Sequence, residues 1–313
     1  MSPLVVSSSP SFGKHTQEPV ELLESRGYQV RLLGRDADQD LAESLETAVA
    51  WIVGFEPVNA QTLAHAANIQ VVAKSGAGMD NFDIPYLQAR GIRTVSVPGG
   101  NARAVAEYTM SQILALARGT VRNDAALREG IWKPTIGSGL DQRTLGIIGF
   151  GAIGQVLAPM ARAFDINVVV HDPFIEVHDA QRLGVELRSL DGLLEVSDFV
   201  SLHVPLTEDT HHLIDSGSIG RMKPGSFLIN NSRGGVVDES ALLDALDSQH
   251  LAGAAIDVFE QEPLPMEHRL RSAENVLLSS HTSGYSDTTL ALVTLTCAEG
   301  VLQALEAAGS QPS

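Results

Sequence analysis

The sequence predicts an α/β protein made of two doubly wound parallel-sheet domains. Short apolar runs alternate with helical patterns over the first hundred residues, and a second alternating series begins at Leu145. Alternation of this kind favours parallel sheets that helices cover on both faces. The 313 residues are enough for two domains of ordinary size.

The first series supplies five predicted strands and four predicted helices. The strands lie at 4–7, 28–33, 50–53, 70–73 and 92–97, and the helices at 19–25, 41–48, 59–67 and 84–90. Pro98, Gly99 and Gly100 end the series, and Asn101 is suited to cap a long helix over 102–118. Residues 119–143 have an irregular pattern.

The second series supplies six predicted strands, with helices between them. These strands lie at 145–148, 167–170, 199–202, 226–230, 253–257 and 276–279. A helical pattern from about residue 287 to 308 follows the last strand and is too short to form a domain. We expect it to pack on the first domain, so that 1–100 and 285–313 form one discontinuous domain and 101–284 the other.

Composition narrows the function classes. The formal net charge is −17, so no basic field exists that would displace counterions from a nucleic acid. Cys297 is the only cysteine, which excludes a disulfide framework and a multi-cysteine metal site, and we expect no metal. The N-terminus lacks a cationic region before its short apolar run, and no apolar stretch is expected to be long enough to span a bilayer. We expect a cytoplasmic protein without nucleic-acid or membrane partners.

A glycine-rich turn opens the second series and indicates a dinucleotide site. Gly149, Gly151 and Gly154 form a G-x-G-x-x-G pattern between a predicted strand and helix, and Asp172 ends the next strand. The first glycine permits a tight turn, the second lets backbone N–H groups approach a pyrophosphate, and the third lets the helix pack closely. Asp172 would accept hydrogen bonds from a ribose diol and repel a 2′-phosphate. The pattern therefore favours NAD over NADP.

Three later strands end in polar residues that suit hydride-transfer chemistry. Arg233 follows one apolar run, Asp257, Glu260 and Glu262 follow the next, and His281 follows a third. Parallel strands bring their carboxyl ends to one edge of the sheet, so these side chains are expected to meet there. Reduction of a 2-oxo acid needs a proton donor such as histidine, a carboxylate that orients it, and an arginine for the substrate carboxylate. From the residues alone, either glutamate can be the partner of the histidine.

Seven motifs along the chain carry a family resemblance. They are KSGAGMDNFD from Lys74, VPGGNARAVAE from Val97, LGIIGFGAIG from Leu145, HVPLTEDTHHLI from His203, NNSRGGVVDE from Asn230, AGAAIDVFEQEP from Ala252 and SSHTSG from Ser279. In this order they make the chain similar to the D-isomer-specific 2-hydroxyacid dehydrogenase family. The resemblance implies an NAD(P)-binding Rossmann domain beside a flavodoxin-like substrate domain, and a homodimer formed through the cofactor domain.

The resemblance also implies residue roles. It makes Arg233 the substrate-binding arginine, His281 the acid/base and Glu262 its partner. It places Ala152 and Ile153 on the pyrophosphate, Asp172 on the adenosine ribose, Val204 and Pro205 beside the adenine, Asn231 and Ser232 beside the nicotinamide, and Asp257 on the carboxamide. It gives the substrate carboxylate to backbone N–H groups of Ser75, Gly76 and Ala77, with Asn101 nearby. The chain departs from the common pattern around the histidine, with Ser280 before it and Ser283-Gly284 after it.

The substrate is predicted from a narrower likeness. The opening SSSPSFGKHTQEPVELLESRGY and the segment GFEPVNAQTL resemble the phosphoglycerate dehydrogenase-like branch, which implies D-3-phosphoglycerate and 3-phosphohydroxypyruvate. Gly54-Phe55-Glu56 is acidic where a cation would help a phosphate, so hydroxypyruvate or glyoxylate reduction is the alternative. The chain ends at Ser313, and we expect no C-terminal regulatory domain. An NAD-sensing corepressor with the same fold is a more distant alternative.

Overall fold

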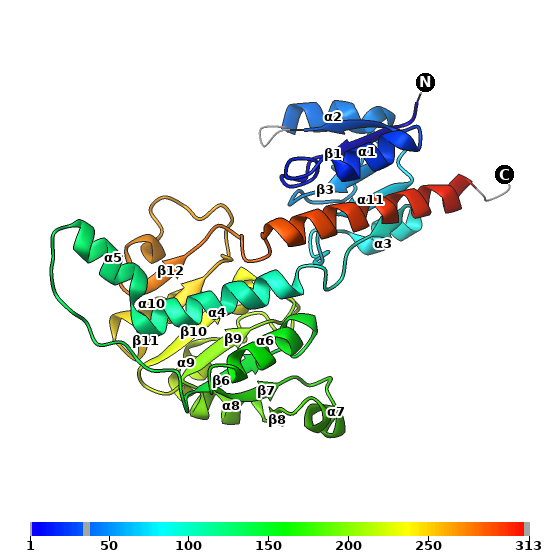
Figure 1. Ribbon diagram of the computed structural model, residues 1–313. Coiled ribbons are helices and arrows are strands. Elements are labelled where there is room, and N and C mark those ends of the chain that lie inside the picture. Colours follow the sequence, from blue (N-terminus) through cyan, green and yellow to red (C-terminus); the bar gives the residue numbers. More distant parts are fainter. Residues whose placement is uncertain (1, 34–37, 310–313) are drawn as a thin grey trace. The chain divides into compact units, whose positions relative to one another are not determined.

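The computed structural model describes residues 2–33 and 38–309 of the chain. The chain folds into two compact units (Figure 1). Unit 1 consists of Met1–Asn101 and Tyr285–Ser313, and unit 2 of Ala102–Gly284. The first boundary lies one residue later than expected from the sequence, and the second, between Gly284 and Tyr285, lies where it was expected.

Unit 1 is built on a five-stranded parallel sheet. Its strands are β1 (Leu4–Ser7), β2 (Gln29–Leu32), β3 (Ala48–Val53), β4 (Val71–Lys74) and β5 (Arg93–Val95), and its helices are α1 (Glu18–Ser25), α2 (Asp38–Thr47), α3 (Ile84–Ala89) and α11 (Asp287–Gly309). The strand order is β2-β1-β3-β4-β5, and every pair is parallel. This is the doubly wound order of flavodoxin-like folds, with its switch point between β1 and β3.

The expected helix over 59–67 is wrong, because this segment forms a series of turns. The Asn59 side chain accepts the N–H groups of Gln61 and Thr62 at 2.9 and 3.1 Å. Such bonds are typical of a helix cap, but the backbone then continues in short turns, with the N–H of Ala66 donating to the carbonyl of Leu63 at 3.2 Å. The apolar contact of this segment is real, because Leu63 is fully buried, but the turns do not continue as a regular helix.

Helix α11 is long and apolar, and it forms part of the core of unit 1. By length and composition alone it passes as a candidate membrane span, contrary to the expectation that no stretch would. Its Val293, Cys297 and Val301 are buried against the sheet of unit 1. A Cβ at Gly300 would lie 2.6 Å from Cγ1 of Val95, so the helix packs very closely on β5. We therefore interpret α11 as a core helix.

Unit 2 is built on a seven-stranded parallel sheet. Its strands are β6 (Thr144–Ile148), β7 (Asn167–His171), β8 (Glu186–Leu187), β9 (Phe199–Leu202), β10 (Ser226–Asn230), β11 (Leu251–Ile256) and β12 (Val276–Leu278), in the order β12-β11-β10-β9-β6-β7-β8. All pairs are parallel. This is the Rossmann order, with its switch point between β6 and β9, so the predicted fold class is confirmed.

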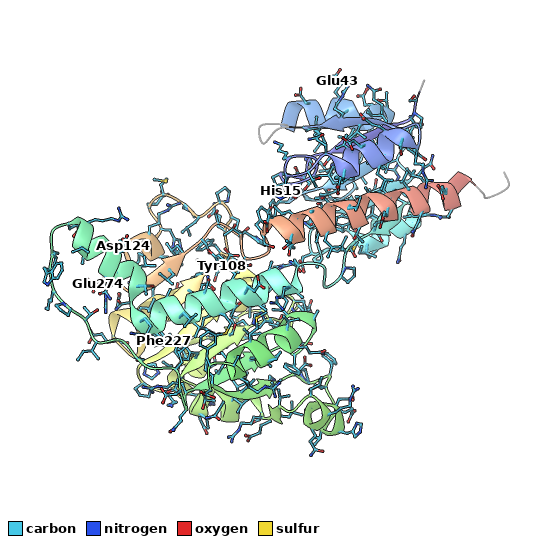
Figure 2. All side chains as sticks on the ribbon, viewed as in Figure 1. His15, Glu43, Tyr108, Asp124, Phe227 and Glu274 are labelled. Carbon is cyan, nitrogen blue, oxygen red and sulfur yellow. The ribbon has the colours of Figure 1, made fainter. Side chains whose placement is uncertain are left out.

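Helices cover both faces of this sheet. They are α4 (Ala102–Arg118), α6 (Ala152–Arg162), α7 (Val177–Arg182), α8 (Leu190–Val196), α9 (Ser216–Arg221) and α10 (Glu239–Asp247). The unit also contains α5 (Thr120–Arg128) and the 3-10 turns η1 (Gly234–Val236) and η2 (Arg269–Ser272). Ile147 faces the core shared with α4 and α6, and the next residue, Ile148, faces the core shared with α8, α9 and α10. Phe227, labelled in Figure 2, lies on β10. Its ring stacks on that of Phe199 in β9, with ring centroids 5.2 Å apart.

Two elements of unit 2 were not predicted from the sequence. Helix α5 lies in the region that was expected to be irregular. None of its residues is buried, so the sequence shows no apolar stripe that would predict a helix there. Strand β8 has only two residues and lies at the edge of the sheet, which is too short for a periodicity to show.

Candidate active site

The predicted chemical residues of unit 2 follow three neighbouring strands. Arg233 comes after β10, Glu262 after β11 and His281 after β12, and these strands are adjacent in the sheet. Because the strands are parallel, their carboxyl ends lie at one edge. The structure thus brings the loops that carry the three residues to the same edge of the Rossmann sheet.

His281 and Glu262 form a direct pair. Nδ1 of His281 lies 2.9 Å from Oε2 of Glu262, and each side chain is about one third exposed. Oε1 of Glu262 accepts the N–H of Phe259 at 3.1 Å. Burial raises the pKa of Glu262, but His281 and the Phe259 N–H outweigh it and hold the pKa below its usual value. The glutamate is therefore an ionised partner that fixes the imidazole.

Asp257 organises the turn on which His281 stands. Its carboxylate is fully buried and accepts the Ser279 hydroxyl at 2.6 Å and the N–H groups of Thr282 and Ser283 at 2.9 and 2.8 Å. Its carbonyl oxygen accepts the His281 N–H at 2.8 Å. His281 has φ +53°, a conformation that non-glycine residues rarely adopt, and these four bonds hold it there. The predicted contact of Asp257 with a carboxamide stays a prediction.

The conformation of the Arg233 loop depends on Asn230, which was not predicted as a site residue. Asn230, fully buried at the end of β10, accepts the N–H and hydroxyl of Ser232 at 3.1 and 2.8 Å and donates to the carbonyl of Arg233 at 2.9 Å. Arg233 is half-buried, and its Nη1 donates to the carbonyl of Ser232 at 2.7 Å. An asparagine at a strand end is a known turn former, and that was the available signal.

Asn231 turns its side chain toward α4. Its Nδ2 donates to Oγ1 of Thr109 at 2.9 Å and to Oε1 of Gln112 at 2.8 Å. Its Oδ1 is buried and has no hydrogen-bond partner within the described part of the chain. The predicted nicotinamide-side contacts of Asn231 and Ser232 stay predictions, and the observed role of Asn231 is to tie the Arg233 loop to α4.

The glycine turn after β6 fits a dinucleotide phosphate. Gly149 has φ +89°, and a Cβ there would lie 2.5 Å from the carbonyl oxygen of His203. A Cβ at Gly154 would lie 2.7 Å from the carbonyl oxygen of Gly149. Gly151 differs, because a Cβ there would meet nothing within 4 Å. Two glycines thus serve the turn and the packing of α6, and the third leaves the backbone open to a ligand.

The residues around this turn complete a nucleotide cradle. Ala152 and Ile153 begin α6, whose first N–H groups have no partners inside the helix and suit an anion. Asp172 accepts the N–H of Phe150 at 2.7 Å through Oδ2 and the N–H of Phe174 at 2.8 Å through Oδ1. The carboxylate is thereby fixed beside the turn, with acceptor capacity left for a ribose diol.

The loop after β9 lies across the switch point from the glycine turn. Val204 approaches Gly149, where a Cβ would lie 2.9 Å from its Cγ1, and Pro205 is exposed. His203 is held neutral because burial lowers its pKa to about 3, and its Nε2 lies 2.9 Å from the Ser201 hydroxyl. The predicted adenine-side role of Val204 and Pro205 stays a prediction.

In unit 1, the predicted carboxylate loop follows β4. The N–H of Ser75 donates to Val53 at 3.3 Å and that of Gly76 to Lys74 at 2.8 Å, and no such bond is recorded for Ala77 in the described chain. Gly76 has φ +157°, a backbone conformation that residues with a side chain rarely adopt. Asn101 directly precedes α4. Of the three predicted donors, Ala77 therefore fits best, and the substrate contacts stay predictions.

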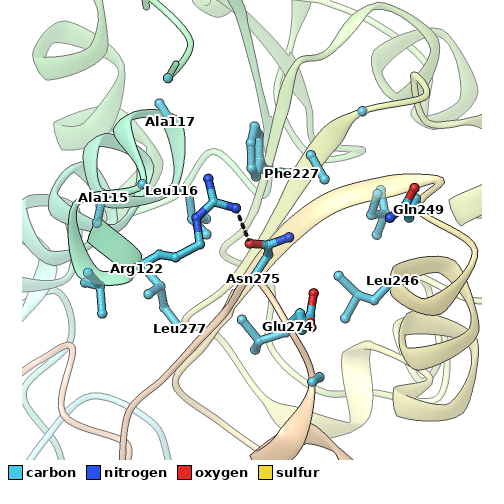
Figure 3. Close-up of a pocket in the computed structure, with 18 of the residues that line it drawn as sticks. Ala115, Leu116, Ala117, Arg122, Phe227, Leu246, Gln249, Glu274, Asn275 and Leu277 are labelled. Carbon is cyan, nitrogen blue, oxygen red and sulfur yellow. Dashed lines mark hydrogen bonds between the residues drawn. The ribbon is translucent and has the colours of Figure 1, made fainter. Parts of the chain in front are cut away.

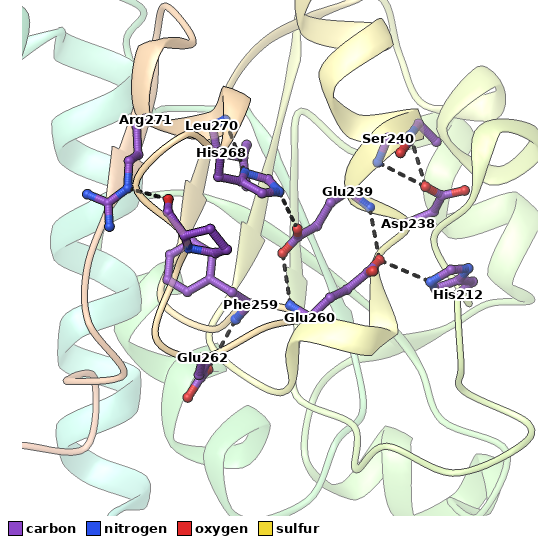
Figure 4. A network of polar contacts seen from close by, with 12 residues as sticks. His212, Asp238, Glu239, Ser240, Phe259, Glu260, Glu262, His268, Leu270 and Arg271 are labelled. Atoms are coloured by element: carbon purple, nitrogen blue, oxygen red, sulfur yellow. Dashed lines mark hydrogen bonds and ion pairs between the residues drawn. The ribbon is translucent and has the colours of Figure 1, made fainter.

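Glu260 does not partner His281. Its Oε1 lies 3.1 Å from Nε2 of His212 (Figure 4). The ring of His212 stacks on that of His211, with centroids 4.0 Å apart. The structure thus decides between the two glutamates in favour of Glu262. Within the described residues, no group of three or more His, Cys, Asp or Glu side chains is placed to hold a metal ion.

A cavity of about 820 Å³ in unit 2 lies away from these residues (Figure 3). It is lined by Gly225, Leu251 and Val276, which lie at or before the starts of β10, β11 and β12. The chemical residues follow the ends of the same strands. The cavity is therefore at the opposite edge of the sheet, and it is not the candidate active site.

Comparisons with known proteins agree with this geometry. Residues 110–283 match the family model of the D-isomer specific 2-hydroxyacid dehydrogenase, NAD binding domain. The chain is 40% identical over 253 residues to a glyoxylate reductase of Korarchaeum cryptofilum, which covers 79% of this chain and 76% of that protein. It is also 40% identical over 232 residues to the D-3-phosphoglycerate dehydrogenase of Mycobacterium tuberculosis, covering 74% of this chain but only 44% of that protein.

The fold comparison covers nearly the whole chain. The TT0316 protein of Thermus thermophilus superposes with a TM-score of 0.88 at 33% identity, over 97% of each chain. The family match covers more than half of the chain, and it includes the glycine turn, Arg233, Glu262 and His281. This chain belongs to the D-isomer specific 2-hydroxyacid dehydrogenase family.

Proposed function

We propose that this protein is an NAD-dependent dehydrogenase that interconverts a D-2-hydroxy acid and its 2-oxo acid. The observation that carries the proposal is the His281–Glu262 pair, 2.9 Å apart. His281 follows β12, Glu262 and Asp257 follow the adjacent β11, and Arg233 follows β10, the next strand in the sheet. Such a pair presents a proton donor and acceptor beside a cation, which is what carbonyl reduction requires.

The roles of the chain's own groups follow from the contacts. Bound NADH supplies the hydride that adds to C2 of the 2-oxo acid. Nδ1 of His281 is held by Glu262, so Nε2 is the nitrogen that gives its proton to the developing alkoxide oxygen. In oxidation Nε2 takes this proton back from the hydroxyl. Arg233 binds the substrate carboxylate and stabilises the charge on the oxygen.

Replacing the histidine tests the proposal. His281→Ala is expected to lower turnover by at least about a hundredfold, since positioned general acids and bases contribute that much or more. Affinity for NAD, measured by calorimetry, should stay within a factor of two because the glycine turn and Asp172 are untouched. Turnover that survives in His281→Ala would remove the assignment.

For the substrate, we propose 3-phosphohydroxypyruvate and D-3-phosphoglycerate. Lys74, the last residue of β4, supplies positive charge directly before the Ser75–Ala77 loop. Its Nζ binds the carbonyl oxygen of Gly54, lies 3.3 Å from Oδ1 of Asn81 and sits over the ring of Phe55. The chain spans about half the length of the phosphoglycerate dehydrogenases it matches, so this assignment rests on the loop chemistry and the sequence likeness.

Hydroxypyruvate or glyoxylate is the second candidate, and Glu56 favours it. This carboxylate stands in the loop after β3, where its Oε2 accepts the Gly54 N–H at 3.1 Å. A negative charge there opposes a substrate phosphate. Oxidation of NADH and NADPH with phosphohydroxypyruvate, hydroxypyruvate, glyoxylate and pyruvate decides between the candidates through the ratio of kcat/KM values. Absence of turnover with every 2-oxo acid would favour an NAD-sensing binding protein.

We also propose a homodimer formed through unit 2. Trp132 is 85% exposed and Ile136 fully exposed, with half-exposed Leu127 and Ile131 close in sequence. Large apolar side chains gathered on one segment indicate an interaction surface. Trp132→Asp together with Ile136→Asp is expected to give a monomer by light scattering, whereas a wild-type monomer would refute the proposal. A cytoplasmic location stays a prediction.

A further inference from the structure

A second carboxylate, Glu239, is buried in unit 2 and takes no part in the proposed reaction. It is the first residue of α10, six positions after Arg233, and its side chain is only 11% exposed. Burial raises the pKa of Glu239 above the usual 4.5, and the Glu260 N–H and His268 act in the opposite direction. A buried carboxylate is costly unless it is hydrogen-bonded, so its partners indicate its role.

Both oxygens of Glu239 have partners (Figure 4). Oε1 accepts the backbone N–H of Glu260 at 3.0 Å, and Oε2 lies 3.1 Å from Nε2 of His268. Nδ1 of His268 accepts the N–H of Leu270 at 3.3 Å, so the proton of the neutral ring is on Nε2. His268 therefore donates to Glu239 and orients it. Glu239 in turn holds the peptide of Glu260.

That peptide belongs to the turn that carries Glu262. The N–H groups of Phe259 and Glu260 are consecutive, and they donate to different carboxylates. Phe259 donates to Glu262 at 3.1 Å, and Glu260 donates to Glu239 at 3.0 Å. Glu262 then holds His281 at 2.9 Å. Glu262, the partner of the acid/base, thus holds the turn through the amide of Phe259, and Glu239 holds it through the next amide, that of Glu260.

The backbone of the Arg233 loop closes the other side of this turn. A Cβ at Gly234 would lie 1.9 Å from the carbonyl carbon of Phe259 and 2.4 Å from the nitrogen of Glu260. Only glycine fits this approach. The charged group of Glu260 faces outward to His212 at 3.1 Å, and its Oε1 also lies 3.4 Å from the N–H of Glu239. Glu239 and Gly234 therefore contact the turn from two sides, and together they fix its position.

We propose that Glu239 is a positioning residue for the Glu262–His281 pair. It holds residues 259–262 in the position from which Glu262 meets the imidazole. The inference rests on the proposed role of His281 as the acid/base. Nothing in it requires Glu239 to touch substrate or cofactor, and its effect is transmitted by the backbone of the turn.

Two substitutions of similar volume separate the acceptor oxygen from simple packing. Glu239→Met fills the space but leaves the Glu260 N–H without an acceptor. Glu239→Gln keeps an oxygen for that N–H and turns its NH₂ toward His268, whose ring is one quarter exposed and open to water. In Glu239→Met we expect kcat to fall about tenfold, as for a small misplacement of a catalytic group. The KM for the 2-oxo acid should change less than about threefold. Glu239→Gln should keep kcat within about threefold of wild type.

The pH profile is the measurement that a merely structural role would not move. A carboxylate partner favours the protonated imidazole. When Glu262 is loosened, the alkaline limb of the reductive kcat profile should therefore move to lower pH. Asp238→Ala is the matched control, because Asp238 caps α10 through the N–H groups of Ser240 and Ala241 and its loss destabilises the same helix. It should lower Tm without moving the limb.

The outcomes are distinguishable. A limb that stays in place in Glu239→Met, or that moves equally in Asp238→Ala, overturns the positioning role. If Glu239→Met does not fold, His268→Ala replaces it: it removes the donor to Oε2 from a ring that is one quarter exposed and should move the limb in the same direction. An unmoved limb there overturns the proposal as well. His281→Ala is run in parallel, since turnover that survives in that variant refutes the proposed function itself.

Discussion

Replacing Asp257 by asparagine is expected to loosen the turn that presents His281. The carboxylate is fully buried and accepts three hydrogen bonds, from the Ser279 hydroxyl and from the N–H groups of Thr282 and Ser283. An asparagine has the same shape but only one acceptor oxygen. Whichever way its amide is placed, an NH₂ group faces a donor of the turn.

The magnitude follows from the number of bonds lost. Oδ1 of Asp257 serves Ser279 and Thr282, and Oδ2 serves Ser283. The cheaper placement of the amide keeps the oxygen at the Oδ1 position and leaves one buried N–H, that of Ser283, without an acceptor. A buried unsatisfied donor costs about 2 kcal/mol, which is about 30-fold in the equilibrium for opening the turn.

Hydrogen–deuterium exchange measures this opening directly. The amides of residues 282 and 283 should exchange about 30-fold faster in Asp257→Asn. Peptides from the unit 1 sheet, such as 71–95, should be unchanged. Ser279→Ala is the matched control: it removes one donor and keeps both N–H bonds, so its exchange at 282 and 283 should rise less than about threefold. Equal exchange in wild type and Asp257→Asn would refute the assignment of this carboxylate to the turn.

The remaining predictions concern the cofactor turn, acid stability and salt. Gly151→Ala should raise the KM for NAD without loss of stability, whereas Gly146→Ala, whose Cβ would lie 2.3 Å from the Ser197 hydroxyl, should cost about 1–3 kcal/mol in urea unfolding. Because its folded-state pKa is lowered, Glu262 should stabilise the fold relative to Glu262→Gln above pH 4.5, and urea titrations should show this difference vanishing at lower pH. Added salt should leave kcat/KM for the 2-oxo acid unchanged or raise it, because it screens the repulsion of an anion by a chain of net charge −17; a fall would contradict this.

The two sheets could be predicted because their inner strands are buried on both faces. Runs such as Val71–Lys74 and Phe199–Leu202 are almost wholly apolar, and the helices between them make the parallel connection nearly obligatory. The elements that escaped are those without this signal. Helix α5 has no buried residue, and β8 is a two-residue edge strand. At 59–67 a real apolar contact was present, since Leu63 is buried, but the backbone after Asn59 forms short turns and not a helix.

The candidate site divides in the same way. Arg233, Glu262 and His281 were predictable because each follows an apolar run that forms a strand. The parallel sheet then brings the ends of these strands to one edge. The supporting residues were not predictable by this route. Asn230 and Glu239 act on backbone groups that are near in space, and a contact such as Glu239 with the Glu260 N–H joins residues 21 positions apart. No periodicity or spacing in the sequence reports a bond of that kind.

The charge of the chain explains why the site must hold its substrate by contact. In unit 2, the loops that follow β6, β9, β10, β11 and β12 directly, up to the next helix or turn, contain one arginine or lysine, Arg233, but several carboxylates, among them Asp257, Glu260 and Glu262. The carboxylate of Asp257 accepts hydrogen bonds from backbone N–H groups, and that of Glu262 binds the imidazole of His281, all within a few ångströms. A carboxylate engaged in this way repels an approaching anion less than its formal charge suggests. Arg233 and the amino-terminal N–H groups of α6 therefore stand out locally as positive, in a protein whose overall field is repulsive, and binding of an anion depends on these short-range groups rather than on steering.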